Sequence, residues 1–122
     1  MVLTHRVPQA DATPFAEPQT VTLDKNQKAT LTWSPNRSGT TFYTPVVAIT
    51  KKADTTYQVK MDGQTVYGEG AIPPTDPDDL VPVWDPPLWF ETELTVTIKN
   101  LGTATNIYHA QPIGWEEGQD GA

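Results

Sequence analysis

The segment ETELTVTIKN, residues 91–100, decides the fold class of this protein. Its apolar residues Leu94, Val96 and Ile98 recur at every second position, and the residues between them are polar. A period of two places the apolar side chains on one face of an extended chain and the polar ones on the other. The segment is therefore predicted to be a strand of an antiparallel sheet, with one buried face and one wet face.

Turn residues divide the rest of the chain into further short segments of this kind. Asp62-Gly63 is typical of a type I′ hairpin turn, which requires positive φ at both central residues. Pro45 predicts a bulge or a late strand start, and Gly114 predicts a bulge near the end of the last strand. The other expected strands are Gln19–Leu23, Lys28–Trp33, Thr41–Thr50, Tyr57–Met61, Thr65–Tyr67 and Asn106–Trp115. The first two are expected to pair as a hairpin.

About seven or eight short strands, with frequent turns and no βαβ spacing, predict an all-β protein. We expect a single antiparallel β-sandwich, immunoglobulin-like or jelly-roll, with an extended N-terminal arm. Closure into a barrel is the alternative. No helix is expected beyond a turn near residues 75–80. The residues expected in the core are Leu31, Val47, Ile49, Tyr57, Val59, Leu94, Val96 and Ile98.

The chain is expected to have three parts: an extended arm at 1–18, a β-sandwich domain at 19–115 and a flexible acidic tail at 116–122. Prolines in the first part oppose regular strand pairing. That part also holds apolar residues that a purely solvated tail would not need. It is either a disordered leader or an arm that lies along a neighbouring subunit. The arm's candidate contact residues are Val2, Leu3, Val7 and Phe15.

Composition excludes several classes of function. The 122 residues carry a net charge of −7 with only eight Lys and Arg, which disfavours binding to nucleic acid or to an anionic membrane. The chain has no cysteine, hence no disulfide and no thiol chemistry. It has neither an apolar stretch that could span a membrane nor the apolar region of a signal peptide. We expect either a cytosolic protein or one assembled in the cytoplasm into a particle.

The residues that could carry chemistry form no recognised motif. His5 and His109 are the two histidines, and neither has a partner nearby in sequence, so a cross-strand hydrogen bond is the expected role of His109. Asp76, Asp78 and Asp79 supply the oxygen ligands that calcium prefers, although a capped turn explains them more simply. We therefore expect a non-enzymatic protein without a cofactor, and calcium is the one metal to test.

The segment 72–90 is the candidate functional surface. Its prolines lower the entropy lost on ordering, and Trp84, Leu88, Trp89 and Phe90 give it apolar anchors. We expect this loop to be ordered without regular structure, to pack across the sandwich and to form an interface with other copies or with a larger shell. The alternative is a carbohydrate-binding or host-adsorption module in which exposed Trp84 and Trp89 stack on a glycan.

Three segments carry a resemblance to a known group of proteins. YQVKMDG at 57–63, IPPTD at 72–76 and LTVTIKN at 94–100 resemble the recurring elements of small structural proteins of haloarchaeal tailed viruses. The resemblance covers roughly the C-terminal half of the chain. It implies a virion protein, such as a capsid decoration or turret component, made in the host cytoplasm. It also implies self-association, expected to be trimeric, and contact with a shell such as a major capsid protein.

Overall fold

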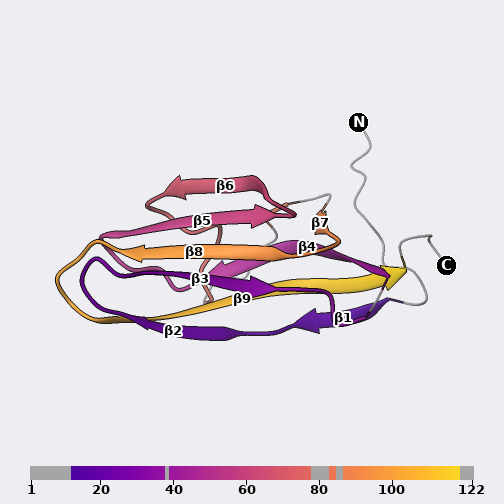
Figure 1. Cartoon of the computed structure of the whole chain (residues 1–122), viewed down its shortest axis with the longest axis horizontal. Helices are drawn as coiled ribbons and strands as arrows, with labels where there is room; N and C mark the ends of the chain where they lie inside the picture. Colours follow the sequence, from indigo (N-terminus) through magenta and orange to yellow (C-terminus); the bar gives the residue numbers. More distant parts are fainter. Residues whose placement is uncertain (1–11, 38, 78–82, 85–86, 119–122) are drawn as a thin grey trace.

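The computed structural model describes residues 12–37, 39–77, 83–84 and 87–118, and within them the chain forms two antiparallel sheets. Most of the strands lie along the long axis of the molecule (Figure 1). Their bounds are β1 Thr13–Ala16, β2 Gln19–Leu23, β3 Lys28–Trp33, β4 Thr40–Ile49, β5 Thr55–Met61, β6 Gln64–Gly70, β7 Leu88–Phe90, β8 Leu94–Asn100 and β9 Asn106–Gly118.

Sheet A has five strands and sheet B has four. In sheet A, β1 and β2 both pair with β9, which pairs with β4, which in turn pairs with β7. Sheet B has the order β3-β8-β5-β6. The two sheets pack against each other as a β-sandwich, which confirms the predicted fold class. Among the described residues, no helix is long and apolar enough to span a bilayer.

The core lies between the sheets, where the alternation predicted it. Leu94, Val96 and Ile98 of β8 are fully buried. Tyr57 and Val59, which point inward from β5, are fully buried as well. Seven of the eight expected core residues are buried. Leu31 is the exception and is only partly buried, because β3 is an edge strand of sheet B and has a neighbour on one side only.

The turn between β5 and β6 has the predicted conformation. Asp62 has φ 51° and Gly63 has φ 80°, the left-handed values that a type I′ turn requires. The bulge signals are confirmed as well. The register of β4 against β9 shifts between Tyr43 and Val46, so that two residues of β4 face the single residue Gly114. A Cβ atom on Gly114 would collide with the backbone carbonyl of Tyr43, so the close approach at this bulge requires glycine.

The predicted β2–β3 hairpin is wrong. β2 pairs with β9 in sheet A, whereas β3 pairs with β8 in sheet B, so the intervening turn crosses from one sheet to the other. Asn100 holds this turn: its carbonyl accepts from Asn26 N at 2.8 Å, its amide donates to Gln27 O at 3.0 Å, and its side chain donates to Leu23 O at 3.0 Å. Both strands bury one face, and alternation alone cannot tell paired strands from opposed ones.

The β-sandwich extends beyond the predicted domain limits at both ends of the chain. Residues 13–16, expected in the arm, form β1 and pair with β9, and residues 116–118, expected in the tail, belong to β9. Phe15 is 3% exposed, and its ring lies 4.2 Å from that of Phe42 in an edge-to-face contact. Phe15 therefore belongs to this chain's own core and not to an interface. The rest of the predicted arm and tail lies outside the described residues.

Candidate functional site

Three aromatic side chains lie side by side on the outer face of sheet A. Trp89 of β7 and Trp115 of β9 are both paired directly with Tyr43 of β4, the strand between them. Directly paired residues point to the same side of a sheet. The rings of Tyr43 and Trp115 are stacked, with centroids 5.8 Å apart and an angle of 22° between their planes. We call Trp89, Tyr43 and Trp115 the aromatic row.

The neighbours of these residues along each strand show that the row faces away from the core. Phe42 and Phe90, each next to a member of the row, are fully buried between the sheets. Tyr43 and Trp115 are half-buried, and Trp89 is 53% exposed. The row therefore consists of two half-buried aromatic side chains on inner strands and one exposed aromatic side chain on the edge strand β7.

The described parts of the 72–90 loop are fixed along β4. Ile49 N donates to Thr75 O at 2.9 Å, and the amides of Val83 and Trp84 both donate to Pro45 O, at 2.8 and 3.2 Å. These bonds satisfy backbone groups of β4 beyond the end of short β7. The prediction of an ordered loop holds for these residues, but the loop includes a strand, because three of its residues form β7. Pro77 lies in a turn, as predicted for this segment, and 78–82 lie outside the described residues.

The residues predicted for the interface occupy different environments. Trp84 and Leu88 are partly buried and pack on the core. Phe90 is fully buried and stacks on Phe42, with ring centroids 4.8 Å apart, so it is a core residue and not an interface residue. Trp84 is therefore not an exposed partner of Trp89 in a stacking platform. Trp89 is the predicted contact residue that the structure leaves largely exposed, and Val2, Leu3 and Val7 lie outside the described residues.

Sequence reasoning missed Tyr43 and Trp115. Tyr43 stands in β4, where burial does not alternate, and Trp115 stands beyond the alternating part of β9, so the sequence pattern did not give their outward direction. Their alignment with Trp89 could not be read from it either, because it depends on the pairing of β4 with both β7 and β9. The bulge at Pro45 also shifts this register by one residue.

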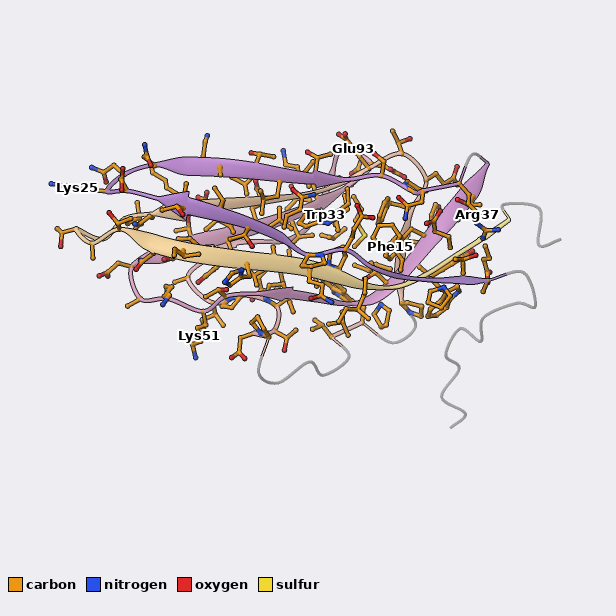
Figure 2. The ribbon with its side chains drawn as sticks, turned by 90° about the horizontal axis from the view of Figure 1, so that it is seen from below. Phe15, Lys25, Trp33, Arg37, Lys51 and Glu93 are labelled. Atoms are coloured by element: carbon orange, nitrogen blue, oxygen red, sulfur yellow. The ribbon has the colours of Figure 1, made fainter. Side chains whose placement is uncertain are left out.

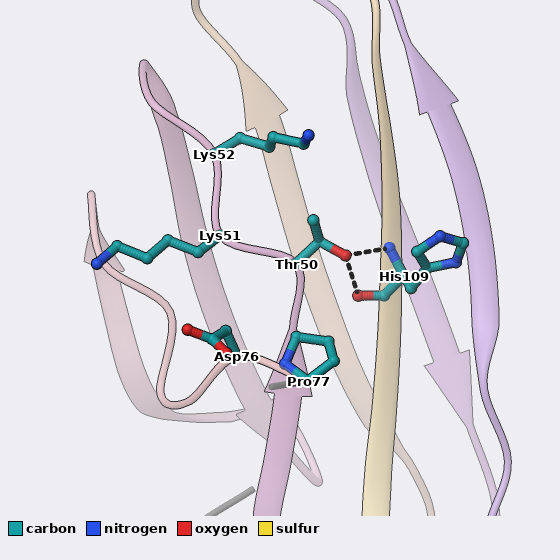
Figure 3. Close-up of a pocket in the computed structure, with 6 residues that line it drawn as sticks. All are labelled: Thr50, Lys51, Lys52, Asp76, Pro77 and His109. Atoms are coloured by element: carbon teal, nitrogen blue, oxygen red, sulfur yellow. Dashed lines mark hydrogen bonds between the residues drawn. The ribbon is translucent and has the colours of Figure 1, made fainter. Parts of the chain in front are cut away.

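His109 has the structural role that its position predicted. Its Nδ1 lies 2.8 Å from the hydroxyl of Thr20, its partner on β2, and its backbone amide donates to Thr50 Oγ1 at 2.9 Å (Figure 3). Thr50 and His109 border a hollow of about 500 Å³, which Lys51 also lines. Lys52 lines the hollow as well, and the side chains of Lys51 and Lys52 extend in different directions (Figure 3). His5 lies outside the described residues.

The calcium site stays a prediction. Asp76 lines the same hollow, but Asp78 and Asp79 lie outside the described residues. Within the part of the chain that the structure describes, no three His, Cys, Asp or Glu side chains are grouped so that they could hold a metal ion. Asp76 alone supplies too few ligands for a cation that prefers six to eight oxygens.

Comparison of the chain with protein-family models, with curated proteins and with solved structures found no match. The resemblance to virion proteins therefore depends on the three segments that carry it. In the structure, 57–63 covers most of β5 and the turn after it, and 94–100 is β8. The segment 72–76 follows β6 in the chain, and its Thr75 forms an isolated bridge to Ala48 of β4.

Proposed function

We propose that this protein is a non-enzymatic structural component of a virus particle, a capsid decoration or turret protein, and that it binds other subunits through the aromatic row. The observation that supports the aromatic row as the binding surface is that Trp89, beside Tyr43 and Trp115, is 53% exposed. The virion assignment is supported by the resemblance of the C-terminal half of the chain. The partners proposed are other copies of this chain, as a trimer, and a shell such as a major capsid protein.

Aromatic side chains are well suited to anchor such a contact. Tryptophan and tyrosine are enriched among the few residues that carry most of the binding energy of protein interfaces. Tyr43 and Trp115 are on inner strands of sheet A and are already stacked, so little side-chain entropy remains to be lost when a partner covers them. The loop beside them is tied to β4 by backbone hydrogen bonds, which lowers the cost of ordering it on binding.

The test compares Trp89→Ala with Ile107→Ala in sedimentation velocity over a range of concentrations. Ile107 is a matched control because it is 54% exposed, also on sheet A, and eight positions along β9 from Trp115. Loss of an interface anchor costs about 2 kcal/mol or more, so we expect Trp89→Ala to weaken self-association by about 30-fold or more. Ile107→Ala should associate like the unmodified protein. If Trp89→Ala also does so, the aromatic row is not the interface.

The same row favours a second candidate, a glycan-binding surface in which the exposed indole of Trp89 stacks on a sugar ring. Quenching of tryptophan fluorescence by host polysaccharide separates the two. The structural proposal predicts no saturable quenching. Saturable quenching that is lost in Trp89→Ala but kept in Ile107→Ala, together with unchanged self-association of Trp89→Ala, would assign the row to glycan recognition.

A further inference from the structure

The aromatic row continues onto one more strand of sheet A. Pro14 of β1 is paired directly with Trp115, so Pro14, Trp115, Tyr43 and Trp89 form one line across β1, β9, β4 and β7. Pro14 is exposed, whereas its neighbour Phe15 points into the core, so Pro14 faces outward with the row. The line crosses from the first of these strands to the last, a width of about 14 Å.

The chain enters the sandwich beside this line. β1 begins at Thr13, and Phe15, two residues later, is held in the core against the ring of Phe42. Figure 2 shows Phe15 and Arg37 toward one end of the molecule, with Lys25 at the other end. The residues that precede β1 are therefore attached at a fixed point next to the aromatic row.

The direction of β1 leads these preceding residues away from the row of their own chain. β1 is antiparallel to β9, and Thr13 is paired with Glu116, one residue beyond Trp115. Followed backwards from Thr13, the strand points past the end of the row and along the strands of the sheet, not across them. A segment attached in this direction covers its own row only after a full reversal, whereas the row of a neighbouring copy requires none.

The segment before β1 is long enough to reach such a neighbour. We call residues 1–11, which lie outside the described residues, the leading segment. A fully extended chain of this length spans about 36–40 Å. That is more than twice the width of the line, so about 20 Å remains for the passage from one copy to the next.

The composition of the leading segment suits an aromatic surface. Val2, Leu3 and Val7 have apolar side chains, which gain free energy when a partner removes them from water. Arg6 is one of the two arginines of the chain. A guanidinium group is attracted to the faces of tryptophan and tyrosine rings, and tryptophan is the best of these partners. The segment therefore combines apolar contacts with a cation for the indole rings.

The surroundings of the row strengthen this attraction. Trp115 Nε1 donates to Glu117 Oε2 at 3.1 Å, and donation to a carboxylate makes the face of the indole ring more negative. The other arginine, Arg37, is engaged at the end of the sandwich, where its guanidinium donates to the backbone carbonyl of Glu116 at 2.8 Å. Arg6 is therefore the arginine that the row is suited to receive.

We propose that the leading segment of one copy lies across the aromatic row of a neighbouring copy, with its apolar side chains on the rings and Arg6 over an indole face. This inference rests on the proposed function and names the part of the partner that covers the row. Each copy gives one segment and receives one. Such a head-to-tail contact forms a closed ring when the rotation between copies closes, and the proposed trimer is a ring of this kind.

The first test is a double-mutant cycle, measured as self-association of the whole chain by sedimentation velocity. Leu3→Asp with Val7→Asp should weaken association by about 30-fold or more, as Trp89→Ala should, because both remove apolar contacts. Added to Trp89→Ala, the pair should cost less than about threefold more, because all three changes affect one contact. Thr4→Asp with Gln9→Asp is the control, with the same added charge at polar positions, and should stay within about threefold of the unmodified protein.

The outcomes separate this inference from the proposed function. If Trp89→Ala weakens association and the Leu3 and Val7 pair does not, the row binds another part of its partner, and only the inference is overturned. If Trp89→Ala has no effect, the row is not the interface, and both fail. If the two effects multiply in the combined variant, the leading segment and the row belong to different contacts, and the inference is overturned.

The second test distinguishes a neighbour's leading segment from the chain's own, and it uses the absence of cysteine from the chain. Copies with Val7→Cys are mixed with copies of different mass that carry Pro14→Cys, so a disulfide between the two can form only between chains. This disulfide should form severalfold faster than one between Val7→Cys and Ile107→Cys copies, because Ile107 is exposed on the same sheet but away from the row.

Equal rates at the two positions would overturn the proposal. So would a disulfide that forms only when Val7→Cys and Pro14→Cys are in the same chain, since the segment would then cover its own row. Thermal melting checks the fold of each variant. If Pro14→Cys does not melt cooperatively, Ala16→Cys takes its place, because Ala16 is the next exposed position of β1 and is paired with Ile113, beside the row.

Discussion

The carboxylate of Asp62 joins the β5–β6 turn to the connection that precedes β8. It accepts hydrogen bonds from the backbone amides of Glu91, Thr92 and Glu93 at 2.9, 2.8 and 3.0 Å. Burial of this carboxyl group acts to raise its pKa, but the three amide hydrogen bonds outweigh burial and hold the pKa below its usual value. The turn itself could be predicted from Asp62-Gly63. These bonds could not, because their donors lie about 30 residues further along the chain.

The lowered pKa of Asp62 predicts a pH-dependent contribution to stability. A carboxyl whose pKa is lower in the folded state stabilises the fold above the unfolded pKa of about 3.9, and this contribution is lost as pH falls through the folded pKa. Asp62→Asn should therefore lower the melting temperature at pH 7, and the gap to the unmodified protein should narrow as pH falls below about 4. Asp54→Asn is the control, because Asp54 is exposed and has the same φ of 51°. A gap that does not change with pH would contradict this account.

At the scale of elements, strand positions could be predicted better than strand partners. Alternation located β5, β8 and β9, and glycine and proline marked the bulge. The pattern did not show that β2 and β3 belong to different sheets. It also missed β1, because this strand has four residues and contains Pro14. β1 pairs along one side only, with β9, and an edge strand tolerates a proline that a central strand would not.

The membership of β1 in the sandwich is testable by substitution of Phe15. Removing a buried phenylalanine side chain costs about 3–5 kcal/mol, a large part of a total stability of about 5–15 kcal/mol. Phe15→Ala should therefore lower the free energy of unfolding in urea by that amount. Thr13→Ala, an exposed change in the same strand, should stay within about 0.5 kcal/mol of the unmodified protein. Equal effects of the two substitutions would show that residues 13–16 do not contribute to the core.

At the scale of the whole molecule, the aromatic row on the outer face of sheet A becomes visible only after the strands are paired. The sequence identified Trp89 as an anchor, but it grouped Trp89 with Trp84, which packs on the core. The actual neighbours of Trp89 are distant in sequence and are brought together by the pairing of β4 with β7 and β9. A surface built from three strands cannot be read from one segment, however rich in aromatics that segment is.

The central claim is that assembly covers the aromatic row. Hydroxyl-radical footprinting of the purified chain, dilute and then concentrated enough to associate, tests it most directly because it reports the exposure of single side chains. Trp89 should be oxidised readily in the dilute protein and severalfold more slowly in the associated one, whereas Ile107, equally exposed in the monomer, should react at the same rate in both. A Trp89 side chain that reacts as fast in the associated protein as in the monomer would contradict the account.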